Sequence, residues 1–304
     1  MILPTRNILL LLLLLGLHRA DAASRFVVIY TSQDQEYAEP ILRDFTRQTG
    51  VDARAVYDSE AVKTVGLSNR LLAEQNHPQC DVFWNNEEFR TRQLAGQNLF
   101  SSSNGWVSIG YRERRLAFNT RNVARSALPH SLVELTNQVW KGKIAIAYPF
   151  FGTTATHFLV LRQQWGADSW ETWCRALAAN KPLLVDGNSV VVQLLGRGEA
   201  QLGLTDSDDI QAGIREGLPI AAHPLPDCSL AIPNTVAVLR LAPHPAEARQ
   251  LFEYLQGDSV REKLLGAGAL LSKTNPPTGK SIAWTPLIAD LEAATETLKK
   301  IFLR

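Results

Sequence analysis

The sequence predicts an α/β protein built as two lobes with a ligand cleft between them. Runs of β-forming residues alternate with segments of helical periodicity, and this alternation occurs in both halves of the chain. Such a β-α-β-α order favours a parallel sheet with helices on both faces. The chain has no low-complexity linker, so two lobes joined by extended crossings fit the pattern better than two tethered domains.

The first lobe is expected to begin with a strand at 26–31, whose sequence FVVIYT is typical of a buried parallel strand. A helix follows at 36–48, because Ile41, Leu42 and Phe45 fall on one helical face and Gly50 can end the helix. The further elements predicted for this lobe are a strand at 51–57, a helix at 59–73 and a strand at 81–84.

The second half of the chain repeats the alternation of strands and helices, and its last part is expected to return to the first lobe. We expect the chain to cross between the lobes near 116–120 and again near 232–238. Residues 23–118 would then form the first lobe, 119–231 the second, and 232–304 would return to the first lobe with the C-terminal helices. The elements predicted after the first crossing are strands at 143–147, 183–186, 200–205 and 231–239, and helices at 155–164, 170–179, 189–195 and 246–256.

The first 22 residues predict export from the cytoplasm. Arg6 gives a basic start, an apolar run covers 8–17, and Ala20-Asp21-Ala22 has the A-x-A spacing of a cleavage site. The run is shorter than the roughly 20 apolar residues that span a bilayer, and no cysteine follows it to carry a lipid. We therefore expect a cleaved signal peptide at 1–22 and a soluble periplasmic product.

Composition restricts the partners. The formal net charge of +1 gives no basis for a nucleic acid or an anionic membrane as partner, and we expect a monomer. The three cysteines, Cys80, Cys174 and Cys228, are not spaced as a metal knuckle. They allow at most one disulfide in an exported protein, so we expect buried thiols and leave one bridge open.

Enzyme signatures are missing from the sequence. There is no G-x-S-x-G, no GKS or GKT phosphate loop, no H-E-x-x-H and no G-x-G-x-x-G after a strand. The histidines after the leader include no pair at i, i+4; His157 could face the cleft, although a surface or capping role fits it better. The sequence therefore favours a binding protein, with a secreted hydrolase as a lesser alternative.

Small polar or acidic residues follow the predicted strands in both lobes. Any one of these segments can be a helix N-cap, because Ser, Thr, Asp and Asn accept hydrogen bonds from the first turn of a helix. Together they predict a polar cleft, because α/β sheets bind ligands at the carboxyl ends of their strands. The segments concerned are 31–36, 57–60, 84–87, 148–154, 186–189 and 205–209.

The last of these segments carries three aspartates, Asp206, Asp208 and Asp209, within the sequence GLTDSDD. Three carboxylates are more than one helix cap needs. We expect a cationic ligand or a metal to relieve their mutual repulsion. The residues after Asp208 do not match an EF-hand loop, so any metal would need carboxylates from separate loops.

The chain also resembles a known family. The similarity begins with FVVIYTSQDQEYAEPILRDFTRQTGV, AVYDSEAVKTVGLSNRLLAE and CDVFWNNE, and continues in order with WKGKIAIAYPFFGTTATHF, VDGNSVV, GLTDSDD and IPNTVAVL. These segments resemble the periplasmic solute-binding proteins of ABC importers, in particular the iron(III)-binding group of the family 1 extracellular solute-binding proteins. The resemblance implies a type II two-lobed fold that closes on its ligand, ABC permease subunits in the inner membrane as partner, and no catalysis.

The sequence departs from that group at the ligand positions. Characterised ferric binders use paired tyrosines of the second lobe, helped by a carboxylate or histidine of the first. Where the tyrosine pair would fall, this chain has TDSDD at 205–209, and near the histidine position it has Asp34. The first-lobe carboxylate that follows DVFW persists here as Glu87, or has moved to that position from the position of Asn86.

Two ligand chemistries remain open. In the first, carboxylates bind ferric iron, because hard cations prefer oxygen ligands. Iron is the only metal expected, and it would be the transported solute and not a cofactor. The resemblance favours iron or an iron complex. In the second, the Thr153-Thr154 turn and its helix N-terminus hold an anionic group, as in a phosphonate, while the aspartates pair with an ammonium on the same solute. The candidate ligand-binding residues are Ser32, Asp34, Glu60, Asn86, Glu87, Thr153, Thr154, Asn188, Asp206 and Asp208, and the candidate metal ligands are Glu60, Glu87, Asp206 and Asp209.

Overall fold

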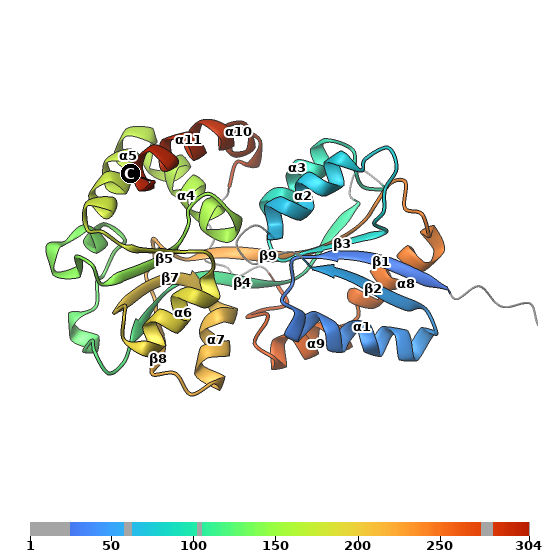
Figure 1. Ribbon diagram of the computed structural model, residues 1–304, viewed down its shortest axis with the longest axis horizontal. Coiled ribbons are helices and arrows are strands. Elements are labelled where there is room, and N and C mark those ends of the chain that lie inside the picture. The colour runs from blue at the N-terminus through green and yellow to red at the C-terminus, as the bar shows by residue number, and fades with distance from the viewer. Residues whose placement is uncertain (1–24, 58–62, 102–104, 275–281, 304) are drawn as a thin grey trace, which may run out of the picture.

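The computed structural model describes residues 25–57, 63–101, 105–274 and 282–303, and it shows two α/β lobes side by side (Figure 1). The predicted leader at 1–22, the start of the helix expected at 59–73, and Glu60 lie outside the described residues. A mixed sheet runs through both lobes in the order β2-β1-β3-β9-β4-β7-β5-β6, with β8 paired to β4. The predicted fold class is confirmed.

The first lobe has a parallel core of three strands with helices on both faces. β1 (Phe26–Thr31) pairs in parallel with β2 (Asp52–Tyr57) and β3 (Val82–Asn85). Apolar side chains of both faces are buried, as expected for such strands. The helices of this lobe are α1 (Gln35–Thr49), α2 (Lys63–Ala73), α3 (Glu88–Gly96), α8 (Pro245–Leu255) and α9 (Asp258–Gly266).

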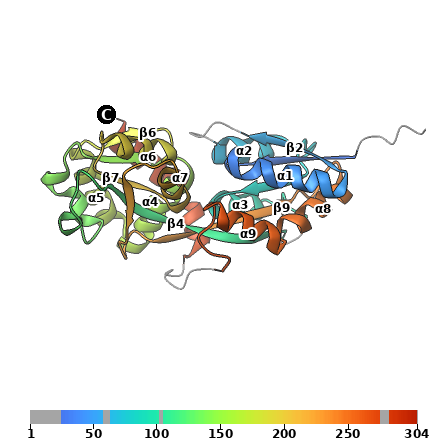
Figure 2. The ribbon, with the colours of Figure 1, turned by 90° about the horizontal axis from the view of Figure 1, so that it is seen from below.

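Two long antiparallel strands, β4 (Trp106–Asn119) and β9 (Leu230–Val238), join the lobes. Figure 2 shows both strands running along one side of the molecule from lobe to lobe. β9 pairs with β3 from Thr235 to Val238, whereas β4 pairs with β7 from Arg114 onward. The change of partner along β4 therefore lies slightly before the crossing expected at 116–120.

The second lobe repeats the α/β arrangement around β5 (Ile144–Ala147), which is parallel to both β6 (Leu183–Val185) and β7 (Leu202–Asp206). β8 (Ile220–His223) adds to β4 at the far end. The helices are α4 (Gly152–Trp165), α5 (Ala167–Ala179), α6 (Asn188–Arg197) and α7 (Ser207–Arg215), with short 3-10 turns at Arg125–Ala127, Val133–Thr136 and Gln138–Trp140.

The C-terminal helix α11 (Leu291–Phe302) packs on the second lobe, not on the first as expected (Figure 1). The short helix α10 (Trp284–Ala289) before it contacts both α3 of the first lobe and α4 of the second, and the Arg92 guanidinium lies 4.9 Å from the centre of the Trp284 ring. Leu298 and Phe302 are buried in one core with residues of α4 and α5, and the Phe302 ring lies 6.1 Å from that of Phe158. The apolar stripe of α11 predicts a buried face, but it does not indicate which lobe covers that face. Only the second lobe receives this helix.

Cys80, Cys174 and Cys228 are buried, unpaired thiols, so the bridge left open by the sequence does not form. Cys80 belongs to the first lobe, while the other two lie in the core of the second. Among the helices of the described residues, none is both long enough and apolar enough to cross a membrane.

The position of α11 gives a test of the lobe assignment. Leu298→Ala should lower the free energy of unfolding by about 2 to 5 kcal/mol, the usual cost of truncating a buried leucine. Hydrogen exchange should accelerate in α4 and α5 but not in α1 or α8. The control is Leu303→Ala, because Leu303 is 57% exposed. Faster exchange in α1 and α8 instead would contradict this assignment.

Candidate ligand-binding site

A cleft of about 530 Å³, open to solvent, lies between the lobes at the carboxyl ends of the strands. This is the position that the sheet rule predicts. The first lobe supplies Asp34 and Asn86, and β4 supplies Arg112. The second lobe supplies the rest of the lining, namely Ala147, Tyr148, Phe151, Gly152, Thr153, Thr154, Asp186, Gly187, Asn188 and Asp209.

Two arginines of β4 reach the aspartate segment. Alternate residues of a strand point to the same face, so Arg112 and Arg114 lie together, and Arg114 is directly opposite Asp206 in the antiparallel register. Arg114 is fully buried and donates to Asp206 Oδ1 at 2.8 Å and to Asn188 Oδ1 at 3.0 Å. Arg112 donates to Asp208 Oδ2 at 2.5 Å and lies 3.2 Å from Asp206 Oδ2.

Asp206 is the centre of this buried network. Its Oδ2 accepts hydrogen bonds from Thr153 Oγ1 at 2.7 Å and from Asn188 Nδ2 at 3.0 Å. Burial alone would raise the pKa of Asp206, but the guanidinium groups of Arg114 and Arg112 lower it below its usual value. Thr153 lies in the first turn of α4, Asn188 begins α6, and Asp206 itself precedes α7. This one carboxylate therefore holds three helix N-termini together.

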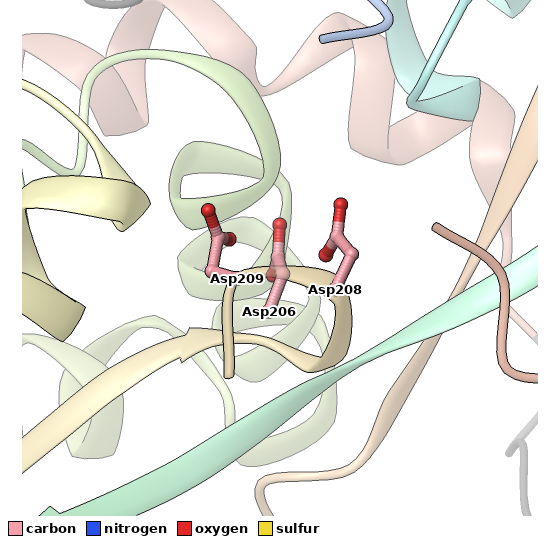
Figure 3. A group of neighbouring side chains, drawn as sticks. All are labelled: Asp206, Asp208 and Asp209. Atoms are coloured by element: carbon pink, nitrogen blue, oxygen red, sulfur yellow. The ribbon is translucent and has the colours of Figure 1, made fainter. Parts of the chain in front are cut away.

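Asp208 and Asp209 lie on either side of Asp206, with all three carboxylates directed away from the turn that begins α7 (Figure 3). Burial and the neighbouring Asp206 raise the pKa of Asp208 to about 6, against the opposing effect of Arg112. Burial, then Asp208 and Asp206, raise the pKa of Asp209 well above its usual value. The positive charge beside the aspartates thus comes from the protein itself, from Arg112 and Arg114, whereas the sequence led us to expect a cationic ligand or a metal.

A metal ion fits this network poorly. Oxygen atoms of Asp206, Asp208 and Asp209 lie within 4.8 Å of one another, which is close enough for shared coordination. However, Arg112 contacts Asp206 and Asp208 on the buried side. A bare cation would have to share these two carboxylates with a guanidinium group of the same sign of charge.

The first lobe presents an asparagine to the cleft, supported by Ser32. Asn86 lines the cleft, while the fully buried Ser32 donates to Asn85 Oδ1 at 2.6 Å and accepts from the Asn86 amide at 2.9 Å. The Asn86 carbonyl oxygen accepts from Arg112 Nη2 at 2.9 Å. Arg112 therefore contacts both lobes, and Ser32 positions Asn86 and does not itself line the cleft.

Glu87 is a helix cap and not a cleft residue. Its Oε2 accepts from the Phe89 amide at 2.6 Å and its Oε1 from the Arg90 amide at 3.0 Å. The side chain is buried and does not line the cleft. Glu87 was expected to face the ligand, but in the structure both of its carboxylate oxygens accept hydrogen bonds from amides in the first turn of α3.

Two helices begin at the cleft without a side-chain cap. The N-cap residues Phe151 of α4 and Gly187 of α6 make no side-chain hydrogen bond. The first N–H groups of a helix have no intrahelical partner and carry the positive end of the dipole. Helix N-termini favour anions, so we refer to Thr153 and Thr154 of α4 and Asn188 of α6, which line this end of the cleft, as the candidate anion-binding floor.

Three residues at or beside the cleft were not expected from the sequence, namely Arg112, Arg114 and Tyr148. The run RERR at 112–115 looks like an exposed charged segment in the sequence. Within a strand, however, alternate residues share a face, so Arg112 and Arg114 lie on one side of β4 and Glu113 and Arg115 on the other.

His157 does not have the surface or capping role expected for it. It is buried beside Arg114 and Asp206, and burial lowers its pKa to about 3. Tyr148 lines the cleft and stacks on Phe150.

Comparison with known proteins now identifies the class. The chain belongs to the bacterial extracellular solute-binding protein family, whose model matches residues 27–269. These are binding proteins of ABC transport and not enzymes, so the chain is a solute-binding protein. It is 23% identical over 309 aligned positions to the major ferric iron-binding protein of Neisseria gonorrhoeae, covering 93% of this chain and 90% of that protein.

Solved structures share the fold. Iron-bound HitA from Pseudomonas aeruginosa has a TM-score of 0.80 at 18% identity, covering 91% of this chain and 99% of HitA. AfuA from Actinobacillus pleuropneumoniae, with exogenous fructose-6-phosphate bound, has a TM-score of 0.76 at 18% identity, covering 91% of this chain and 98% of AfuA. The same architecture therefore occurs with ligands of opposite charge, and the fold alone does not identify the solute.

The buried ion pair can be tested by removing one cation. Arg114→Met should lower the free energy of unfolding by about 3 to 5 kcal/mol, because it leaves a buried carboxylate without its partner. Combining it with Asp206→Asn should restore part of this loss. The control is Arg197→Met, because Arg197 pairs with Glu199 at the surface, where the two side chains are 57% and 53% exposed and the loss should be about 1 kcal/mol or less. Equal losses in both variants would contradict the role given to Arg114.

Asp208 predicts a pH dependence of stability. The folded protein keeps a proton on Asp208 up to about pH 6, whereas the unfolded chain loses it near the ordinary value of 3.8. The stability contribution of Asp208 is therefore largest below about pH 4 and is lost as the pH rises to about 6. In urea unfolding, the free energy of wild type minus that of Asp208→Asn should fall across this window and then level off. A difference that rises with pH would show that the pKa is lowered instead.

Proposed function

We propose that the protein captures a small solute through an anionic head group, phosphoryl or carboxylate, and delivers it to an ABC permease. The observation that carries this proposal is the pair of helix N-termini, α4 and α6, that open onto the cleft without side-chain caps. Helix N-termini bind anions through their N–H groups and dipoles. Arg112, which also lines the cleft, adds positive charge beside them.

Capture would involve both lobes. The second lobe offers the first turns of α4 and α6, while Asp34 and Asn86 face them from the first lobe. Arg112 lies at the junction, bonded to the Asn86 carbonyl on one side and to Asp208 on the other. A solute that contacts both lobes would favour closure about β4 and β9, as in hinged binding proteins.

Ferric iron or an iron complex is the second candidate. It is supported by the names of related proteins and by three carboxylates with oxygens within 4.8 Å. The ion pairs of Asp206 and Asp208 with arginine argue against a bare ion. Iron chelated by a small polycarboxylate suits this cleft better, because the chelator would bring anionic groups to the same helix N-termini.

Ligand screening separates these candidates. The purified protein would be analysed by native mass spectrometry and elemental analysis, and then by thermal shift with phosphate esters, phosphonates, dicarboxylates and ferric citrate. A true ligand at a hundredfold excess over its dissociation constant stabilises the folded state by about 2.7 kcal/mol. We expect stabilisation by phosphoryl or carboxylate solutes without metal. Stabilisation by ferric salts alone would overturn the proposal.

A charge at the N-cap of α4 provides the matching variant. Phe151→Asp would place a carboxylate where it caps α4 and repels an anion, so the dissociation constant of a phosphoryl or carboxylate ligand should rise at least tenfold. Phe151→Ala removes the same ring without adding charge, and it should change affinity by only a few-fold. Unchanged binding by Phe151→Asp would place the anion elsewhere.

A further inference from the structure

We propose that the solute is a zwitterion, and that an acidic subsite formed by Asp34, Asp208 and Asp209 binds its ammonium group. This inference rests on the anion site described under the proposed function and specifies the class of solute. Asp34 comes from the first lobe and the other two from the start of α7 in the second. The subsite therefore spans the two lobes, as a group that favours closure should.

The acidic subsite adjoins the anion-binding floor. Asp34 and Asp209 line both the cleft that contains the α4 and α6 N-termini and the neighbouring pocket at the mouth between the lobes. Asp208 lines that second pocket. A solute of a few carbon atoms could thus place its anionic end on the helix N-termini while its other end meets the carboxylates.

One buried oxygen indicates a missing donor. Asp208 is 2% exposed, and although its Oδ2 accepts from Arg112, its buried Oδ1 has no hydrogen-bond partner in the described part of the chain. Buried polar atoms are nearly always hydrogen-bonded, and leaving one unsatisfied is costly. Figure 3 shows the Asp208 and Asp209 carboxylates on either side of Asp206, directed away from the α7 turn. An N–H group of the solute would satisfy Oδ1.

The charges lead to the same conclusion. Arg112 and Arg114 are engaged by Asp206 and Asp208. Across the described ranges no lysine or arginine forms an ion pair with Asp209, whose Oδ2 accepts a long 3.5 Å hydrogen bond from Thr205. A cationic group of the solute would therefore meet no protein cation already ion-paired to Asp209 among the described residues.

An ammonium group fits this charge better than a metal ion. A hard cation such as Ca²⁺ takes six or more oxygen ligands, and Arg112 already contacts two of the carboxylates. An alkylammonium has three N–H donors, one for each of the three aspartates. The ammonium group also needs none of the carboxylate oxygens that Arg112 already contacts.

Matched solutes test the inference in the wild-type protein. Isothermal titration would compare 2-aminoethylphosphonate with ethylphosphonate, 3-aminopropylphosphonate with propylphosphonate, and β-alanine with propionate. We expect at least one amine to bind tenfold or more tighter than its partner without the amine. Equal affinities within every pair would overturn the ammonium subsite while leaving the anion site intact. No binding by any of the six would overturn both.

A charge-neutral variant locates the effect. Asp209→Asn should reduce the preference for the amine by about tenfold and leave the affinity of the alkyl analogue nearly unchanged. The matched control is Asp168→Asn, because Asp168 occupies the first turn of α5, is exposed and does not line the cleft. A preference that survives in Asp209→Asn, or that falls equally in Asp168→Asn, would contradict the assignment. The comparison of solutes in wild type stands even if a variant folds poorly.

Discussion

The buried ion-pair network of Arg112, Arg114, Asp206 and Asp208 is the interaction on which the ligand cleft depends. Charges are costly to bury unless they are paired and hydrogen-bonded, so each member is held by the others. Asp206 also accepts from Thr153 and Asn188, which fixes the first turns of α4 and α6 beside α7. Through the Asn86 carbonyl, Arg112 extends the network into the first lobe.

This network determines which charges remain for a solute. The second lobe uses two arginines to neutralise two aspartates below the cleft. The helix N-termini of α4 and α6 then lie at one end of the cleft, while the carboxyl groups of Asp209 and the half-buried Asp34 lie at the other. A site of this kind would distinguish solutes by the arrangement of their charges, as the proposed function requires.

The sequence predicted the architecture and half of this site, for physical reasons. Alternating strands and helices specify a parallel sheet, and the sheet rule placed Asp206, Asp208, Asp209, Thr153 and Thr154 near one cleft. Arg112 and Arg114 could not be found this way, because pairing across β4 and β7 depends on a strand register between distant segments. Glu87 followed its local preference and capped α3. The apolar face of α11 predicted burial, but the lobe that covers it is a tertiary choice.

The most direct test of the central claim is an amide NMR titration of the deuterated protein, first with a phosphoryl solute identified by screening and then with ferric citrate. We expect saturable shifts that begin at the amides of Thr153, Thr154 and Asn188, where α4 and α6 open onto the cleft. Iron-induced broadening centred on 206–209, with no response of the α4 and α6 amides to any anion, would contradict the central claim. In that case the aspartates, and not the helix N-termini, would be the ligand-binding groups.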